Sequence, residues 1–308
     1  MKTKATKKPG PFPGEQTEDG AFARQEDIFR EVIEADEAAR WPVEKGRYHL
    51  YISLACPWAH RAYLFLKFCG LEDWIGVTVV DPVRDDKGWA FRDGDGFGRD
   101  PVKGFRYLSE AYEKSQPGYR GRVTVPVLWC RKEGRIVNNS EDDLCIFFNK
   151  VFPGRGVDLF PEELREEQQK LSEKIYETVN NGVYRAGFAT RQEPYEEAVK
   201  ALFATLDELE ERLSGGAPYL LGKKPTEADW RLFCTLIRFD AVYVGHFKCN
   251  WKRIADYPFL SAYLQRLYAE PGVAETVRMD HIKDHYYRTH PEINPSGIVP
   301  LGPELPWL

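Results

Sequence analysis

The sequence contains no apolar run near the ~18 residues that a helix needs to cross a membrane. Charge is nearly balanced, with 43 Lys and Arg against 48 Asp and Glu and a net charge of −5. No long basic stretch follows the first ten residues, which argues against nucleic acid as the main partner. The basic start, Met1 to Lys8, is followed by Pro and Gly instead of an apolar segment, so it does not resemble a secretory signal. We therefore expect a cytoplasmic protein.

Cysteine is scarce, with six residues in a chain of 308, and no C-x-x-C pair occurs. This number is too small for a disulfide framework. Apolar neighbours surround Cys69, Cys130, Cys145 and Cys234, which we expect to be buried thiols. Cys56 differs from these four because it follows a strand-like segment.

The first half of the chain has the pattern of an α/β domain behind a polar extension. We expect an extension over residues 1–46 with one helix from Gln25 to Ala39, and an α/β domain over 47–155. The segment 84–120 is polar and rich in glycine, which predicts an insertion or a long loop. The other predicted elements, in chain order, are a strand at 48–54, a helix to Phe68 ended by Gly70, a strand at 77–80, a hairpin of strands at 122–130 and 135–138, and a helix from Ser140 to about Val151.

Residues 161–308 have the periodicity of helices and show no convincing strand. The expected helices cover 162–186, 194–213, 226–243 and 258–269, the third beginning with a capping box from Thr226 to Asp229. The stretch 294–300 contains too many helix breakers and is expected to pack as an extended arm. The predicted architecture is an α/β domain followed by an all-helical domain.

Cys56 stands where the first strand passes into a helix, and Pro57 suits the first helical position because its missing N–H would be unpaired there. The free N–H groups and the dipole of a helix start stabilise a thiolate relative to a thiol. His60 and Arg61 add positive charge in the first turn, which fits a site that an anion also occupies. These features favour a catalytic cysteine over a structural one in a turn.

Ala59 occupies the position at which a dithiol oxidoreductase carries its second cysteine. An internal disulfide therefore cannot close at this site. If Cys56 forms a disulfide during turnover, its partner comes from another molecule, and a small thiol such as glutathione is the obvious candidate in a reducing cytosol.

Two further positions suggest a binding site for an extended, peptide-like ligand. Val125-Pro126 opens the third strand, where proline fits either an edge or a cis turn, and a cis proline would leave the backbone of Val125 free to pair with a ligand. Ser140 begins a helix, where it either caps the helix or lies beside N–H groups that hold a carboxylate. The three acids that follow Ser140 would repel an anionic ligand.

The residues around Cys56 resemble those of a cysteine-type glutathione transferase. The matching motifs are the segment Leu54 to Arg61, the Val125-Pro126 strand, and Leu221-Gly222 leading into Thr226 and Asp229. Further motifs narrow the resemblance to the xi class, the glutathionyl-hydroquinone reductases: 46–51, 81–82, 88–89, 181–184, 238–240, 246–250 and 294–300. The resemblance extends over nearly the whole chain from about Gly20.

The resemblance implies a thioredoxin-like domain followed by a helical domain, and it implies that the protein forms a homodimer. It implies that the Cys56 thiolate attacks the sulfur of a glutathionyl-hydroquinone and forms a mixed disulfide, which a second glutathione resolves. Tyr184 matches the family's proton donor. Tyr243 and Tyr286 match tyrosines that neighbour the cysteine and lower its pKa.

Glutathione itself is the co-substrate that the resemblance implies. Trp89 matches a contact residue, and the backbone of 122–125 matches the segment that pairs with the tripeptide; the residues concerned are Arg122, Val123, Thr124, Val125 and Pro126. The family's Glu-Ser pair falls at 140–141, where this chain has the reverse order, Ser140-Glu141. Either the two side chains exchange roles, or glutathione binds more weakly or in a shifted pose.

Two alternatives to a glutathionyl-hydroquinone reductase remain at this stage. One is an omega-like thiol transferase that acts on protein–glutathione disulfides or dehydroascorbate, and the other is a glutathione-fold binding protein without turnover. His281, His285 and His290 are close in sequence, but suitably spaced cysteine or acidic ligands are missing, so we expect no metal.

Overall fold

The computed structural model describes residues 13–154 and 156–305. The described chain divides into two compact units. One holds the residues up to Gln25, Glu162–Arg266, and the residues from Tyr286 onward; the other holds Glu26–Pro161 and Leu267–His285. The N-terminal extension is thus divided between the units after Gln25. We call them the helical unit and the sheet unit.

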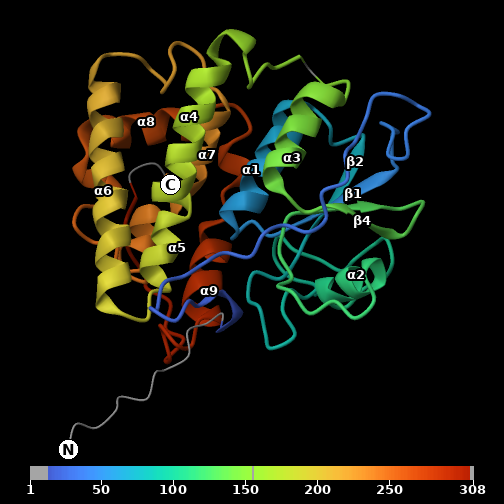
Figure 1. Cartoon of the computed structure of the whole chain (residues 1–308), viewed down its shortest axis with the longest axis horizontal. Helices are drawn as coiled ribbons and strands as arrows, with labels where there is room; N and C mark the ends of the chain where they lie inside the picture. The colour runs from blue at the N-terminus through green and yellow to red at the C-terminus, as the bar shows by residue number, and fades with distance from the viewer. Residues whose placement is uncertain (1–12, 155, 306–308) are drawn as a thin grey trace, which may run out of the picture. The chain divides into compact units, whose positions relative to one another are not determined.

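The sheet unit is built on four strands, β1 (Tyr48–Ile52), β2 (Ile75–Val79), β3 (Val127–Cys130) and β4 (Arg135–Asn138), in the order β2-β1-β3-β4. β1 runs parallel to β2 and antiparallel to β3, and β3 and β4 form the expected hairpin. All five residues of β1 are buried. Helices α1 (Pro57–Phe68) and α3 (Glu141–Ile146) pack against each other, and α2 (Leu108–Ser115) lies beside β4 (Figure 1).

The third strand begins at Val127, so the prediction that it starts at Arg122 is wrong. The pairing of β1 with β3 ends at Tyr51 opposite Val127. The preceding residue, Pro126, has no N–H to donate to a neighbouring strand. The Val125–Pro126 peptide is cis, the second of the two alternatives considered for this proline.

The helix predicted from Gln25 to Ala39 is absent: the backbone is extended up to Glu34 and then forms a turn in which the Ala39 N–H donates to the Asp36 carbonyl at 3.1 Å. Asn139 and Val137, at the end of β4, bind its backbone: Phe29 donates to the Asn139 side chain (2.9 Å), Asn139 donates to the Phe29 carbonyl (2.9 Å), and Glu31 donates to the Val137 carbonyl (3.1 Å). The available sheet edge therefore decides the conformation of this segment, against its local helical propensity.

Helix α2 is an element that the sequence analysis missed within 84–120. The Glu110 carboxylate caps it by accepting from the N–H groups of Arg106 and Tyr107, both at 2.9 Å. Only Leu108, Ala111 and Tyr112 of its residues are buried, a pattern too short to stand out from a polar segment.

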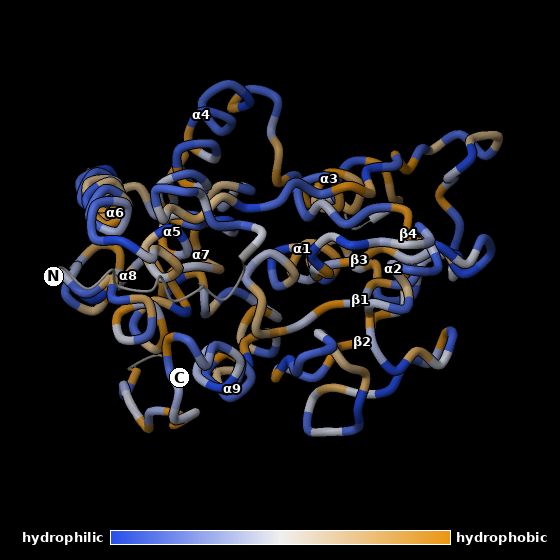
Figure 2. Tube along the Cα trace, turned by 60° about the horizontal axis from the view of Figure 1, so that its bottom comes forward, coloured by the Kyte–Doolittle hydropathy of each residue, from blue (hydrophilic) through white to orange (hydrophobic). Residues whose placement is uncertain are grey.

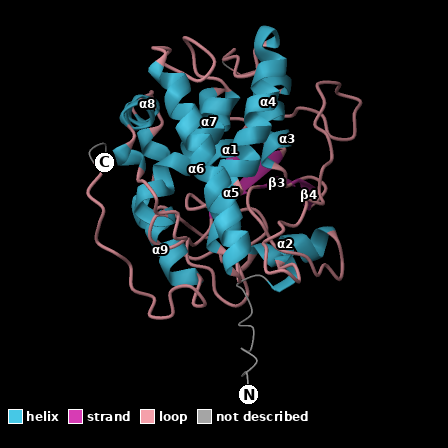
Figure 3. Cartoon of the chain, turned by 60° about the vertical axis from the view of Figure 1, so that its left-hand side comes forward, coloured by secondary structure: helices cyan, strands magenta, loops and turns pink. Residues whose placement is uncertain are grey.

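The helical unit contains α4 (Arg165–Ile175), α5 (Gly182–Gly187), α6 (Gln192–Ser214) and α7 (Glu227–Arg238), followed by α8 (Pro258–Tyr268) (Figure 3). These helices confirm the predicted periodicity, except that Asn181 interrupts the first one. π-helical turns continue α4 over Tyr176–Asn180 and α7 over Phe239–Tyr243. All residues of α7 are buried, whereas α6 alternates between hydrophilic and hydrophobic residues along its length (Figure 2).

Two features of the C-terminal region differ from expectation. Helix α9 (Met279–Thr289) was not predicted, because its 11 residues are largely charged, histidine or tyrosine. The segment 294–300 is free of helix, as predicted. The side chain of Ile298 is 69% exposed and Leu301 is fully exposed, so the arm does not pack tightly there.

Candidate active site

Cys56 is the N-cap residue of α1, with extended backbone angles and Pro57 after it as predicted. All six cysteines lie in the described part of the chain; Cys56 is partly exposed and the other five are buried. The Cys56 thiol lies 3.6 Å from the carbonyl oxygen of Val125, to which it donates. The fold thus brings the cysteine and the cis proline turn together within the sheet unit.

The positive charge of the first turn of α1 meets carboxylates of the protein itself. Arg61 pairs with Glu141 at 3.2 Å, and both side chains are buried. It also pairs with Asp142, while Arg30 pairs with Asp143. The three acids at the start of α3, which we expected to repel an anionic ligand, are thus each paired with an arginine, and two arginines offset two of the three negative charges. His60 is buried, and its ring Nε2 bonds to the Thr276 hydroxyl at 2.7 Å.

The backbone of 122–125 is held by two tyrosines. Tyr119 donates to the Arg122 carbonyl at 2.7 Å, and Tyr112 donates to the Thr124 carbonyl at 3.0 Å and accepts from the Thr124 N–H at 3.2 Å. Within residues 13–154 and 156–305, no backbone hydrogen bond is made by the Val125 N–H. This N–H is therefore available to an extended ligand.

Ser140 and Glu141 stand at the start of α3, as predicted. Ser140 is the N-cap residue, and its N–H donates to the Asn138 side chain at 2.7 Å. Its hydroxyl makes no cap bond to the helix backbone. Glu141 forms an ion pair with Arg61 at 3.2 Å. The two side chains of the Ser140-Glu141 pair therefore have different surroundings.

Trp89 is buried and stacks on the ring of His285, with centroids 5.0 Å apart and an interplanar angle of 16°. The guanidinium carbon of Arg84 lies 5.3 Å from the centre of the Trp89 ring. His285 bonds through Nδ1 to the Pro82 carbonyl at 2.7 Å, so this nitrogen carries the proton. His285 thus helps to fix the position of the Trp89 ring.

The three predicted tyrosines meet in the helical unit. Tyr286 lies on α9, and its hydroxyl is hydrogen-bonded to the hydroxyl of Tyr184 on α5 and, at 3.0 Å, to that of Tyr243. We call these three residues the tyrosine cluster. Burial raises the pKa of Tyr243 and of Tyr286 well above the ordinary value, and the charge of Arg238 opposes this. Tyr287 is not part of the cluster and donates to the Ala241 carbonyl at 3.1 Å.

Some residues at these sites had no signal in the sequence. Tyr112 holds the backbone of residues 122–125, and Arg24, from the N-terminal extension, lies over the ring of Tyr184. Tyrosines and arginines are frequent in the chain, and these contacts join residues far apart in sequence. Only the folded chain could single them out.

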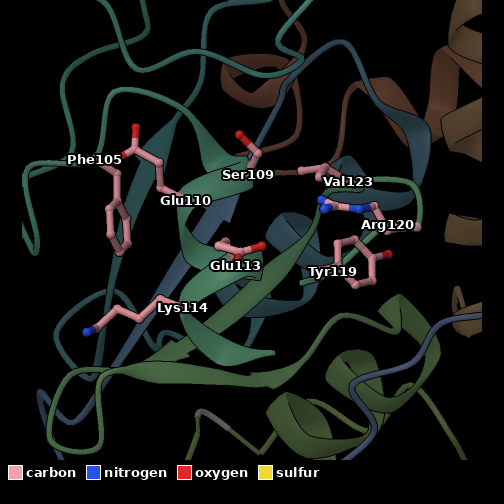
Figure 4. A pocket seen from close by; sticks show the side chains of 9 residues that line it. Phe105, Ser109, Glu110, Glu113, Lys114, Tyr119, Arg120 and Val123 are labelled. Atoms are coloured by element: carbon pink, nitrogen blue, oxygen red, sulfur yellow. The ribbon is translucent and has the colours of Figure 1, made fainter. Parts of the chain in front are cut away.

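An open hollow of the sheet unit lies elsewhere, around α2. Figure 4 shows this open hollow of about 800 Å³, lined by Phe105, Ser109, Glu110, Glu113, Lys114, Tyr119, Arg120, Gly121 and Val123. It borders residues 122–125 at Val123, and neither Cys56 nor Trp89 lines it. In the described ranges, no group of three or more His, Cys, Asp or Glu side chains is arranged to hold a metal, and no helix is long and apolar enough to span a membrane.

Comparison with known proteins connects this geometry to a family. The glutathione S-transferase N-terminal domain matches residues 55–149, and the glutathione S-transferase C-terminal domain matches 192–266. The glutathionyl-hydroquinone reductase PcpF of Sphingobium chlorophenolicum is 47% identical over 93% of this chain and 91% of its own.

Two solved structures have the same fold. The xi glutathione S-transferase of Phanerochaete chrysosporium superposes with a TM-score of 0.88 at 45% identity, over 92% of this chain and 97% of its own. The glutathione-bound structure of YqjG, a glutathione transferase homologue of Escherichia coli K-12, gives a TM-score of 0.87 at 46% identity, over 90% and 93%. The chain therefore belongs to the xi class of the glutathione transferase family, with a thioredoxin-like N-terminal domain and a helical C-terminal domain.

Proposed function

We propose that this protein is a glutathione-dependent reductase that removes glutathione from glutathionyl-hydroquinones through a Cys56–glutathione mixed disulfide. The observation that carries the proposal is the position of Cys56: a partly exposed thiol at the start of α1, beside the cis proline turn, with Ala59 where a second cysteine would stand. The relationship to glutathionyl-hydroquinone reductases at 47% identity supports the substrate class.

In the first step, the Cys56 thiolate attacks the sulfur of the conjugate. An S–S bond forms between Cys56 and glutathione while the bond from sulfur to the aromatic carbon breaks. The bonding electrons of the broken bond stay on the aromatic carbon, which takes up one proton and leaves as hydroquinone. The conjugate is reduced in this step, and the two sulfur atoms are oxidised to the disulfide.

In the second step, the thiolate of another glutathione attacks the glutathione sulfur of the mixed disulfide. Cys56 leaves as a thiolate, and oxidised glutathione is released. The start of α1 stabilises this leaving group through its free N–H groups and dipole. Because glutathione is the reductant, the reaction fits a cytoplasmic location.

The proton for the aromatic carbon comes, in this proposal, from Tyr184. Its hydroxyl is bonded to that of Tyr286, which is bonded in turn to Tyr243. When Tyr184 gives up its proton, the Tyr286 hydroxyl can donate a hydrogen bond to the phenolate, and the Tyr243 hydroxyl can donate to Tyr286. Such a chain of hydrogen bonds stabilises the phenolate. A phenol with such support is a suitable general acid for a carbon leaving group.

Glutathione binding is assigned to the sheet unit. The Val125 N–H donates a hydrogen bond to the cysteinyl part of the tripeptide. The backbone of Arg122 to Pro126 lies along the rest of the ligand, and the Trp89 side chain contacts it. At 140–141 we propose that the side chains exchange roles: the Glu141 carboxylate takes the γ-glutamyl ammonium group, and Ser140 takes its carboxylate. The ion pair with Arg61 holds the Glu141 side chain in place for this purpose.

We also propose that the chain acts as a homodimer, which sedimentation at several protein concentrations tests directly. Disulfide exchange of the omega-like type uses the same Cys56 step without a proton on carbon, so we expect it as a side activity. A binding protein without turnover is disfavoured by the presence of Cys56 and the intact tyrosine cluster.

The test is the rate of hydroquinone release from a synthetic glutathionyl-hydroquinone by the wild type and by Cys56→Ser. We expect release to fall by at least about a thousandfold without the nucleophile, and mass spectrometry of the wild type to trap a glutathione adduct on Cys56. Equal rates in the two proteins would remove the catalytic assignment. Cys130→Ser, which changes a buried thiol, is the matched control and should retain the rate if it folds.

A further inference from the structure

Residues 13–25, the described start of the N-terminal extension, form hydrogen bonds with residues 188–190, which follow Tyr184 in the chain. Gln16 donates to the Phe188 carbonyl at 3.0 Å, and the Thr190 N–H donates to the Gly20 carbonyl at 3.0 Å. The buried ring of Phe22 packs edge-on against Phe188, with centroids 5.2 Å apart. These residues all belong to the helical unit, so residues 13–25 form part of its structure.

Gly20 makes the close approach of this segment possible. Its φ is +86°, in a region that favours glycine. A Cβ atom at this position would lie 2.8 Å from side-chain atoms of Thr190 and Arg191. The contact between residues 13–25 and the end of α5 therefore depends on glycine.

Arg24 links this segment to the tyrosine cluster. Its Nε donates to the Asn181 side chain at 3.0 Å, and its guanidinium carbon lies 4.9 Å from the centre of the Tyr184 ring. The backbone carbonyl of Asn181 accepts from the Tyr184 N–H at 3.0 Å. Asn181 thus orients both the arginine, through its side chain, and the first turn of the helix that carries the tyrosine.

A guanidinium over an aromatic face is attracted to the ring, and it is attracted more strongly when the ring carries a negative charge. Other groups also act on the cluster: the Tyr286 hydroxyl, the Tyr243 ring 6.1 Å from that of Tyr184, and the charge of Arg238 on Tyr243 and Tyr286. Arg185, next to Tyr184 in sequence, pairs instead with Glu197. Arg24 therefore supplies a positive charge directly at the ring face of Tyr184.

We propose that Arg24 is a positioning residue for proton donation: it fixes the Tyr184 ring and stabilises the phenolate left when the proton moves to the aromatic carbon. A proton from water then restores the phenol. This inference rests on the proposed function of Tyr184. It gives the start of the N-terminal extension a part in the reaction.

Three variants test it: Arg24→Met, which removes the charge, Arg24→Lys, which keeps it, and Arg40→Met as a control. Arg40 lies in the same extension, with its guanidinium carbon also 4.9 Å from an aromatic ring, that of Trp41. We expect R24M to lower kcat for conjugate reduction about tenfold, with KM and disulfide exchange unchanged. R24K should recover most of kcat, and R40M should behave like the wild type.

A second measurement does not depend on turnover. Fluorotyrosine placed at position 184 reports ionisation of this ring by fluorine NMR, and the resonance should titrate at lower pH in the wild-type background than in R24M. If kcat and exchange fall together in R24M without recovery in R24K, Arg24 has only a structural role and the proposal is overturned.

Identical titration curves in the wild type and R24M overturn it as well. If the wild type does not reduce the conjugate at all, the proposed function fails, and the fluorine titration still decides whether Arg24 acts on Tyr184. The two failures are therefore distinguishable.

Discussion

Tyr184 and Tyr286, 102 residues apart in sequence, share a hydrogen bond between their hydroxyl groups. Tyr286 bonds at the same time to Tyr243, so its hydroxyl is the central member of the cluster. Removing this one oxygen abolishes the hydrogen bonds that Tyr286 makes to both of the other tyrosines. The neighbouring Tyr287 bonds to a backbone carbonyl instead, which makes it a natural control.

We predict that Tyr286→Phe slows reduction of a glutathionyl-hydroquinone by about tenfold or more, and slows disulfide exchange much less. Exchange needs no proton on carbon, so it does not use the cluster in this way. Steady-state rates with both substrates measure the difference. Tyr287→Phe should leave the ratio of the two rates as in the wild type; if it shifts the ratio as strongly as Tyr286→Phe, the cluster has no special part in proton transfer.

Alkylation of the native protein should modify one thiol. Cys56 is partly exposed at a helix start, whereas the other five cysteines are buried, and burial raises the pKa of Cys69 and Cys249. We expect one equivalent of iodoacetamide in the native protein and six after denaturation, counted by mass spectrometry. The rate should rise with a midpoint below the ~8.5 of an ordinary cysteine. Cys56→Ser should take up no label while folded, and rapid labelling of that variant contradicts the assignment.

The Glu141 assignment predicts a change in glutathione affinity. Glu141→Gln removes the charge proposed to hold the γ-glutamyl ammonium group, so the KM for glutathione should rise about tenfold, with kcat little changed. Asp142→Asn is the matched control, since Asp142 also pairs with Arg61 but is half exposed. An equal rise in KM for both variants would mean that they act through Arg61 alone.

Stability should fall as the pH is lowered, because His49 is buried in its neutral form. Arg131 donates to its Nδ1 at 2.8 Å, so Nε2 carries the proton and donates to Thr78 at 2.7 Å. Burial, and then the charge of Arg131, lower its pKa to about 4, against a nearby Asp100 that opposes the shift. The unfolded chain binds a proton near pH 6.5 and the folded chain does not until about pH 4.

The contribution of His49 is therefore fully present above pH 6.5 and is lost as the pH falls toward 4. Between pH 7 and pH 5 it should lower the free energy of unfolding by about 2 kcal/mol. His49→Gln should reduce the pH slope by this amount in urea titrations. Thr78→Val is the control: it removes a hydrogen bond of His49 and should lower stability without flattening the slope. His246, whose pKa burial also lowers to about 4, adds to the slope in every variant.

Asp229 should be among the acids whose loss costs the most stability. It is fully buried and accepts from the N–H groups of Leu220 (2.9 Å) and Thr226 (2.7 Å) and from the Tyr263 hydroxyl (2.9 Å). Replacement by Ala leaves these donors buried and unpaired, so we expect a loss of about 3 kcal/mol in chemical denaturation. Asp256→Ala removes a capping acid that is partly exposed and should cost much less. Equal losses would contradict this account.

Prediction from sequence worked where neighbouring residues decide the structure. The strand before Cys56, Pro57 at the first helical position and Gly70 after the helix specify α1 within one segment of chain, and its N-cap cysteine with it. Prediction from sequence failed where residues far apart in the chain determine the local structure. Residues 26–39 have the composition of a helix, but Asn139, more than 100 positions away, binds the extended backbone at Phe29.

The candidate site divides in the same way. The position of Cys56 at a helix start follows from its immediate neighbours, whereas for Pro126 the sequence left an edge position and a cis turn open, and the structure has the cis form. The tyrosine cluster was assigned only through family resemblance, since nothing within the sequence distinguishes three of 16 tyrosines. Neither local sequence nor family resemblance pointed to Arg24, because it is one polar residue in a polar extension. Only its contact with the Tyr184 ring in the structure indicates a role.

Strand β4 is the last strand of its sheet, and residues 29–31 run antiparallel along its outer side. This covering segment occupies backbone groups that would otherwise be open to a strand from another molecule. A chain that starts after residue 34 would leave the outer edge of β4 uncovered, and we expect it to aggregate in solution. We therefore expect residues 29–31 to protect the edge of β4 from pairing with a strand of another molecule.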